Sequence, residues 1–239
     1  MSSERRQFVR FLFLRVDPLW RRLSADERGA SLTDFGDLVT RWDNRILVRT
    51  FSTVGMRGDC DFMLWQVSER LEDFQELAAE VAASRLGAYL ETPYAYLSMT
   101  KHSTYVTDHT HPGQEGSRLV IAPGNARYLF VYPFVKTRPW YALPFAERQR
   151  MMNVHIALGH KYTSVKIHTT YSFGLDDQEF VLAFETDSPS DFLDLVQEMR
   201  ETEASSYTLR DTPIFTCVLS PIREVLASLA GETKQTALA

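Results

Sequence analysis

Tyr132, Lys136 and His155 carry side chains that could bind a metal and move charge, and their spacing suggests that they lie together. His155 lies one helical turn after a pair of methionines and one turn before Gly159, so its imidazole belongs to the apolar stripe of a helix. Tyr132 and Lys136 are four residues apart in a strand-like run and therefore point to one face. Neutral imidazole is a common iron or zinc ligand, and a nearby phenol and ammonium could hold an anionic redox ligand.

A plainer interpretation is also open for these three residues. His155 could be a buried histidine whose ring makes one hydrogen bond. Tyr132 could be a tyrosine at a strand edge, and Lys136 a solvated lysine. Gly159, one turn after His155, would let a flat ligand approach closely if the first interpretation holds.

The composition excludes several classes of protein. The chain has 239 residues, of which 26 are basic and 31 acidic, and this balance does not favour nucleic-acid binding. Its apolar runs are far shorter than the roughly 20 residues that span a bilayer. Arg10 and Arg15 interrupt the N-terminal apolar stretch, so a signal peptide is not expected. Cys60 and Cys217 form no CxxC motif, which excludes a cysteine zinc site and fits a cytoplasmic protein.

The chain resembles itself at an offset near 120 residues. Trp20 matches Trp140, and the dipeptide Glu27-Arg28 matches Glu147-Arg148. Further matches are Leu23 with Leu143, Gly55 with Gly174, Phe62 with Phe180, and Phe74 with Phe192. The sequence therefore predicts two copies of one α+β unit.

Within each copy, the pattern predicts the order strand, helix, strand, strand, helix, strand. Ser24 and Glu27 form a capping box at one helix start, and Pro144 suits the first turn of its equivalent. The expected strands are 8–16, 46–52, 61–67 and 94–99, then 128–135, 164–172, 179–185 and 214–219, and the second helices are 71–84 and 190–203. This is the ferredoxin-like order, so we expect two such repeats that form a dimeric α+β barrel within one chain.

Three segments follow from this division: an N-terminal repeat (1–98), a connecting loop (99–126) and a C-terminal repeat (127–239). A single functional site needs its residues in only one of the two copies, and some equivalent positions do differ in residue type. His155 replaces Phe35, and Lys136 replaces Val16. We therefore expect the N-terminal repeat to be structural and the C-terminal repeat to carry the site. The loop is long for a plain connection and holds three of the six histidines.

The motifs of the C-terminal repeat resemble those of a known family. They are Tyr132-Pro133-Phe134-Val135-Lys136, Trp140-Tyr141-x-Leu143-Pro144, Glu147-Arg148-Gln149, His155, Gly159 and Tyr162. Together with the run GLDDQEFVLAFETDSPSDFLDLVQEMR, they resemble the chlorite dismutase-like haem proteins, and most of all the coproheme decarboxylases of haem synthesis. The resemblance is densest over about 127–220.

The resemblance implies roles for individual residues. His155 would be the proximal iron ligand, Tyr132 the redox-active tyrosine, and Lys136 a catalytic contact of a propionate. Trp140 would pack near the porphyrin, and Glu203 would support the proximal histidine. The implied partners of the propionates are Arg118, Arg200, Ser205 and Tyr105.

The distal side departs from the oxygen-evolving chlorite dismutases, which carry an arginine on the strand that matches 165–167. Alignment through Gly174 places Ile167 there, whereas a direct count from His155 places His168 there. Neither can hold an anionic intermediate as a guanidinium does, which argues against efficient chlorite breakdown. A distal base would then come from the connecting loop. His102, His109 and His111 are the candidates, and His111 is preferred, although the pair His109 and His111 could simply be solvent-exposed.

The implied reaction is the peroxide-dependent oxidative decarboxylation of two propionates of iron coproporphyrin III, which yields haem b. The substrate would then also be the cofactor. The resemblance further implies a homopentamer and a transient contact with a ferrochelatase. A haem peroxidase, a chlorite dismutase-like enzyme, a non-catalytic haem-binding protein and a haem-free member of the family stay open as alternatives. A peroxidase would not need Tyr132.

Overall fold

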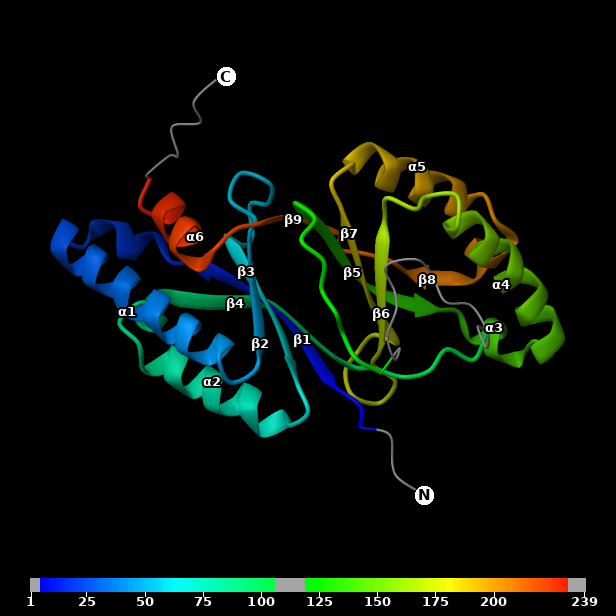
Figure 1. Ribbon diagram of the computed structural model, residues 1–239, viewed down its shortest axis with the longest axis horizontal. Coiled ribbons are helices and arrows are strands. Elements are labelled where there is room, and N and C mark those ends of the chain that lie inside the picture. Colours follow the sequence, from blue (N-terminus) through cyan, green and yellow to red (C-terminus); the bar gives the residue numbers. More distant parts are fainter. Residues whose placement is uncertain (1–4, 106–118, 232–239) are drawn as a thin grey trace. The chain divides into compact units, whose positions relative to one another are not determined.

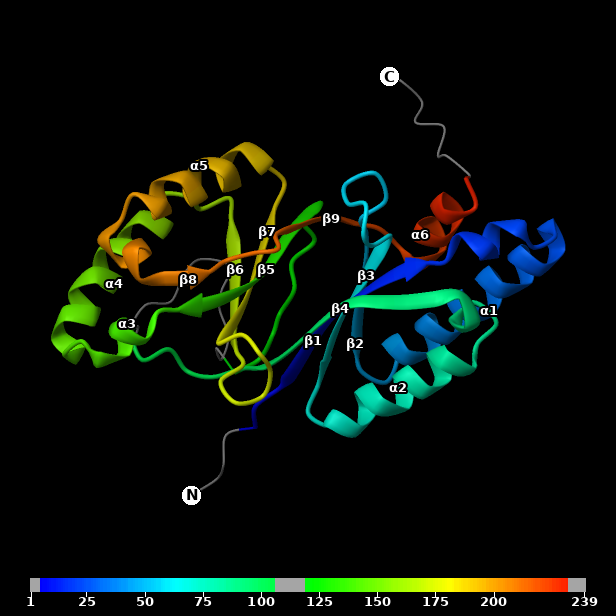
Figure 2. The same cartoon turned by 180° about the vertical axis from the view of Figure 1, so that it is seen from behind.

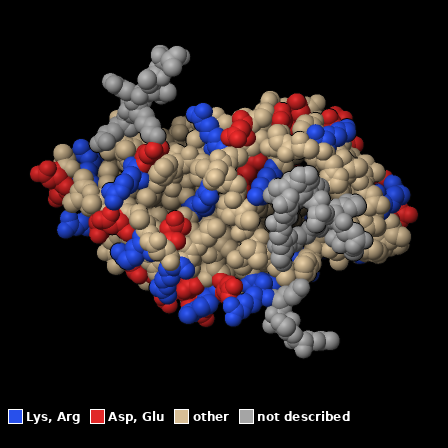
Figure 3. Space-filling model, in the orientation of Figure 1, with Lys and Arg blue, Asp and Glu red and all other residues tan. Residues whose placement is uncertain are grey.

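The computed structural model describes residues 5–105 and 119–231 and divides the chain into two compact units. We call Phe8–Tyr96 with Cys217–Ala239 the α1 unit, and Met1–Gln7 with Leu97–Thr216 the α4 unit. Figures 1 and 2 show both units from opposite sides. Charged side chains of both signs are interspersed on the face drawn in Figure 3. No helix in the described ranges is long and apolar enough to cross a membrane.

In the α1 unit, strand β3 lies between β1 and β2 in an antiparallel sheet, with Leu14 and Ser52 both opposite Phe62. The capping box predicted at Ser24 and Glu27 is confirmed at the start of α1. The elements are β1 (Phe8–Val16), η1 (Pro18–Arg22), α1 (Ala25–Asp43), β2 (Leu47–Ser52), β3 (Phe62–Ser68), α2 (Leu71–Ala83), η2 (Gly87–Tyr89), β4 (Leu90–Met99) and α6 (Ile222–Leu229). The last residues of β4 belong to the α4 unit.

In the α4 unit, strand β7 lies between β5 and β6, and all pairings are antiparallel. The short strand β8 pairs with the other edge of β5. The elements are β5 (Tyr128–Lys136), α3 (Arg138–Ala142), α4 (Phe145–Gly159), β6 (Lys166–Tyr171), β7 (Phe180–Thr186), α5 (Pro189–Arg200), η3 (Glu203–Tyr207), β8 (Thr208–Arg210) and β9 (Phe215–Leu219). The last residues of β9 belong to the α1 unit. The fold is therefore α+β, as expected.

The division of the chain differs from the expected segments at the C-terminus. Helix α6 belongs to the α1 unit, whereas we expected the C-terminal repeat to extend to residue 239. The reason is apolar packing, because a side chain on Gly36 of α1 would lie 3.4 Å from Leu226 of α6. Arg223 also donates a hydrogen bond to Asp37 over 2.8 Å. This helix has no equivalent in the sequence pattern of the other copy.

A hydrogen bond recurs at corresponding positions of the two units. In the α1 unit, the Asp61 carboxylate accepts the backbone N–H of Val16 over 2.7 Å. In the α4 unit, the Glu179 carboxylate accepts the backbone N–H of Lys136 over 2.8 Å. Each carboxylate fixes the end of the first strand of its unit. Lys136 therefore leaves the sheet at a defined place.

Candidate functional site

The side of the sheet on which each predicted residue lies follows from the strand register. Phe184 on β7 pairs with Phe130 on β5 and with Ile167 on β6, and directly paired residues share a face. Phe184 also packs against Phe192 of α5, with ring centroids 5.1 Å apart. We call this face the helix side of the α4 unit. Tyr132 lies on it too, two residues along β5 from Phe130.

The same register decides between Ile167 and His168. Ile167 lies on the helix side with Tyr132, whereas His168 points to the opposite face. The His168 ring is buried there, and its Nε2 atom lies 2.6 Å from Oε1 of Glu185. That carboxylate also accepts the backbone N–H of Gly124 over 2.9 Å. His168 is therefore not a residue of the helix side.

The helix side of the α4 unit leaves part of its sheet uncovered. Gln66 lies four residues after Phe62, and Phe184 lies four residues after Phe180. Val48 pairs with Gln66 as Ile167 pairs with Phe184, so the two apolar residues are equivalent. Val48 is 4% exposed, whereas Ile167 is 41% exposed. In the neighbouring equivalent pair, Thr50 is buried and Thr169 is exposed.

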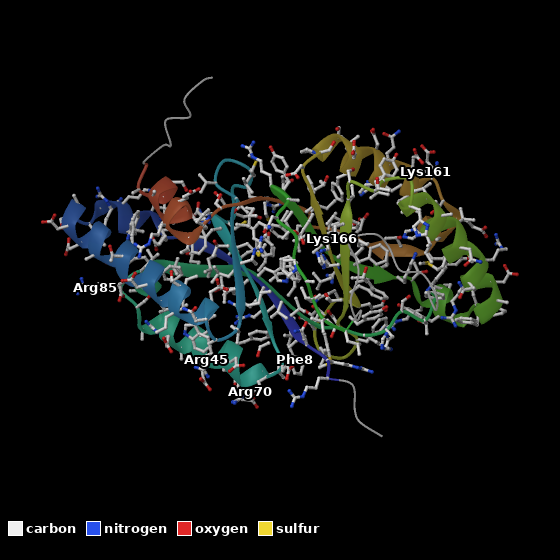
Figure 4. The ribbon with its side chains drawn as sticks, viewed as in Figure 1. Phe8, Arg45, Arg70, Arg85, Lys161 and Lys166 are labelled. Carbon is white, nitrogen blue, oxygen red and sulfur yellow. The ribbon has the colours of Figure 1, made fainter. Side chains whose placement is uncertain are left out.

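Helix α4 shows the same lack of packing. Its counterpart α1 buries six residues, which are Ser31, Phe35, Gly36, Leu38, Val39 and Trp42, whereas α4 buries only Met151. Figure 4 labels Lys161, which lies two residues after the end of α4, and Lys166, the first residue of β6. A strand face that exposes Ile167 and Thr169, and a helix that buries few residues, leave surface on which a flat ligand could pack.

His155 lies in the middle of α4 and is half-buried. Burial and, to a smaller extent, the nearby charge of Lys136 together lower the pKa of its imidazole to about 4. The ring is therefore neutral at pH 7. It makes no hydrogen bond within the described residues, so nothing there supports a histidine satisfied by a structural hydrogen bond. A neutral imidazole of this kind is available as a metal ligand.

Lys136 is held inside the site rather than solvated. Its Nζ donates to the carbonyl of Ala204 over 2.6 Å and lies 4.6 Å from the ring centroid of Trp140. Burial lowers the pKa of Lys136 to about 8, and the Glu179 carboxylate opposes this shift. Ser205 follows Ala204 in η3, so its backbone is joined directly to the carbonyl group that accepts from this ammonium.

Tyr132 is 8% exposed, and its ring stacks on Phe184 with centroids 5.7 Å apart. Burial raises the pKa of its phenol, and the Asp211 carboxylate raises it further, while Arg200 opposes them. Arg200 and Asp211 form an ion pair at 3.0 Å. The structure thus brings Arg200, a predicted propionate partner, near the predicted redox tyrosine.

The other predicted residues are less closely joined. Tyr105 packs edge-on against Trp140 at 6.3 Å and accepts a hydrogen bond from Arg148 over 3.1 Å. His102 is exposed. His109, His111 and Arg118 lie outside the described residues. Among the described residues Glu203 makes no hydrogen bond to His155, and both of its carboxylate oxygens accept from Arg150 over 2.9 Å.

These residues fit an iron porphyrin with propionate groups. No three His, Cys, Asp or Glu side chains in the described ranges gather to hold a bare metal ion, so His155 suits an iron that brings its other ligands with it. The exposed side chain of Ile167 offers an apolar contact for the macrocycle. Lys136 and Arg200 can pair with carboxylates.

The sequence did not predict a functional role for two residues of this region, Glu179 and Tyr141. The buried carboxylate of Glu179 accepts the hydroxyl of Tyr141 over 2.6 Å in addition to the backbone N–H of Lys136. Tyr141 stood in the motif but was given no role. Glu179 follows a turn, where an acidic residue is usually solvated, and only its burial distinguishes it.

Comparison with known proteins identifies the family of this chain. The chlorite dismutase family profile matches residues 28–220. A coproheme decarboxylase of Mycolicibacterium smegmatis is 30% identical over 189 residues, which are 78% of this chain and 79% of the relative. A mutant chlorite dismutase from Candidatus Nitrospira defluvii is 26% identical with a TM-score of 0.85, covering 94% of this chain and 95% of that chain. A haem-binding protein from Thermus thermophilus shares the fold, with a TM-score of 0.83, 23% identity and the same coverage. The chain therefore belongs to the chlorite dismutase family.

Proposed function

We propose that this protein is a coproheme decarboxylase that uses hydrogen peroxide to convert two propionates of iron coproporphyrin III into vinyl groups, which yields haem b. The observation that carries the proposal is the buried phenol of Tyr132 on the same sheet face as the uncovered Ile167. Each propionic acid group and one peroxide would give one vinyl group, one carbon dioxide and two waters, so the atoms balance. The bound iron porphyrin supplies the reaction with peroxide and the oxidising equivalents.

The residues of the α4 unit have distinct parts in this proposal. His155 holds the iron through its neutral imidazole. Tyr132 gives up an electron and its Oη proton, and the resulting phenoxyl removes a hydrogen atom from the β-carbon of a propionate. Its raised pKa keeps the phenol protonated beforehand. Lys136, Arg200 and Ser205 orient the carboxylates.

Ile167 favours decarboxylation over chlorite breakdown. Its alkyl side chain lies on the helix side, where a guanidinium would be needed to hold an anionic intermediate. The similarity to a chlorite dismutase therefore supports the fold more than the reaction.

The repeated Asp61 and Glu179 hydrogen bonds support a further part of the proposal. The two copies would be ferredoxin-like repeats that form a dimeric α+β barrel within one chain. The N-terminal copy would then serve as scaffold, and the C-terminal copy would hold the ligand.

The test is a titration of the protein and iron coproporphyrin III with hydrogen peroxide, followed by mass spectrometry of the porphyrin. We expect the stepwise loss of two carboxyl groups in the wild-type protein and none with Tyr132→Phe, while peroxide consumption continues. Porphyrin that keeps all four carboxylates in the wild-type sample would contradict the proposal. A parallel sample with chlorite and an oxygen electrode would then identify a chlorite-degrading enzyme.

A further inference from the structure

Glu179 joins the end of β5 to helix α3 through two hydrogen bonds. The roles proposed above do not explain these bonds. Glu179 is 8% exposed and accepts two hydrogen bonds, from the backbone of Lys136 over 2.8 Å and from the Tyr141 hydroxyl over 2.6 Å. Burial and the Glu179 carboxylate both raise the pKa of Tyr141, so its phenol stays a donor. A buried carboxylate that accepts hydrogen bonds from two groups holds both groups in fixed positions. We call this pair of hydrogen bonds the Glu179 anchor.

The two donors enclose the segment that carries the cation of the site. Lys136 ends β5, and Tyr141 lies five residues later in α3, with Trp140 beside it. The ring of Trp140 lies 4.6 Å from Nζ of Lys136, and that ammonium also donates to Ala204. Fixing both ends of 136–141 therefore limits where the ammonium can lie.

The α1 unit shows which of the two hydrogen bonds to Glu179 belongs to the common scaffold. There, Asp61 accepts the backbone N–H of Val16 over 2.7 Å, as Glu179 does for Lys136. The position equivalent to Tyr141 is the exposed Arg21. The strand-end hydrogen bond therefore belongs to the scaffold of both units, whereas the bond from Tyr141 is added in the unit that carries Lys136.

We propose that Glu179 and Tyr141 are positioning residues that hold the ammonium of Lys136 in place to bind a porphyrin propionate. This rests on the proposed function, because it assumes a ligand with carboxylates at Lys136. The bond from Tyr141 sets the geometry of the segment. The Glu179 charge additionally favours the protonated form of Lys136.

The experiment measures the affinity of metal-free coproporphyrin III, which removes the contribution of iron. Tyr141→Phe should weaken binding at pH 7 by about three- to tenfold, the range that one hydrogen bond of ordinary net strength corresponds to. Lys136→Met should weaken it at least as much. Tyr141→Phe introduced together with Lys136→Met should add little, because both changes act on one contact. Asp61→Asn is the matched control for Glu179→Gln and should leave binding unchanged.

The pH dependence gives a second readout that a merely structural residue would not move. Glu179→Gln should shift the pH at which binding weakens below the wild-type value, while Asp61→Asn should not shift it. Tyr141→Phe that is fully additive with Lys136→Met, or that binds like the wild type, would overturn the positioning role alone. Wild-type protein that binds no coproporphyrin, with or without iron, would overturn the proposed function and this inference together.

Discussion

Helices α1 and α4 follow the first strand of their units, yet they are packed differently. Phe35 of α1 is fully buried, with its ring centroid 5.9 Å from that of Phe62. The equivalent residue of α4 is His155, which is half-buried and makes no hydrogen bond within the described residues. One scaffold position thus serves as a core contact in one unit and as an available metal ligand in the other.

The sheets beneath these helices differ in the same way. Val48 is covered in the α1 unit, whereas the equivalent Ile167 is 41% exposed. In the α1 unit, helix α6 contacts β2 as α1 does, so two helices cover this layer. The described residues of the α4 unit include no counterpart of α6, and we infer that a ligand packs over the exposed Ile167 instead.

The largest expected difference is in the free energy of unfolding of the ligand-free variants Phe35→Ala and His155→Ala. Phe35→Ala should cost about 3–5 kcal/mol of unfolding free energy, because it leaves a cavity in a filled core. His155→Ala should change the stability of the ligand-free protein by less than about 1 kcal/mol, because the side chain is only half-buried and makes no hydrogen bond within the described residues. Denaturant unfolding of the two variants checks this. Equal losses of stability would show that α4 is packed like α1.

For the affinity of iron porphyrin, we expect His155→Ala to have the larger effect and Phe35→Ala the smaller one. His155→Ala should weaken the affinity by about 100-fold, which corresponds to about 3 kcal/mol. Phe35→Ala should leave it near the wild-type value at a temperature where the variant is folded. A titration followed by the porphyrin absorption band measures both. Comparable affinities of the two variants would contradict the assignment of His155.

An intermediate effect is expected from the titration of Lys136. Its pKa in the ligand-free protein is lowered to about 8, and a bound carboxylate favours the charged form. Binding of coproporphyrin should therefore take up a proton above pH 8, and the affinity should fall as the pH rises through that value. Lys136→Met should remove this fall. The pH dependence of Kd for both proteins checks it, and a wild-type profile that is flat between pH 7 and pH 9 would be evidence against Lys136 as the propionate contact.

The smallest contrast concerns the paired sheet positions. Val48→Ala should destabilise the ligand-free protein by about 1–2 kcal/mol, since the side chain is fully packed. Ile167→Ala should destabilise it less, by under about 1 kcal/mol, because the residue is 41% exposed. With porphyrin bound, Ile167→Ala should become the more costly of the two. Thermal unfolding with and without ligand measures this, and an unchanged order of the two variants would argue against a ligand over Ile167.

Much of this structure could be predicted from the sequence because local signals agree with the fold. The strand 8–16 is confirmed as β1, and the capping box at Ser24 is confirmed at α1. The choice between Ile167 and His168 could not be made, since a shift of one residue moves a side chain to the other face. Only the pairing with β7 decides it.

Other features depend on contacts between distant residues. The sequence does not reveal that α6 packs on α1, because that contact joins Gly36 and Leu226. The sequence also gives no sign that Arg150, on the same helix as His155, donates to both carboxylate oxygens of Glu203. A charged side chain can pair with any of several oppositely charged groups, and the spacing of residues in the sequence does not show which pair forms.

The central claim is that His155, at the position that Phe35 occupies in the other unit, is the iron ligand. The direct measurement is the iron–histidine stretch in the resonance Raman spectrum of the ferrous porphyrin complex. We predict this band in the wild-type protein and in Phe35→Ala, its absence in His155→Ala, and its return when imidazole is added to His155→Ala. A band that persists in His155→Ala without imidazole, or one that is missing from the wild-type protein, would contradict the account.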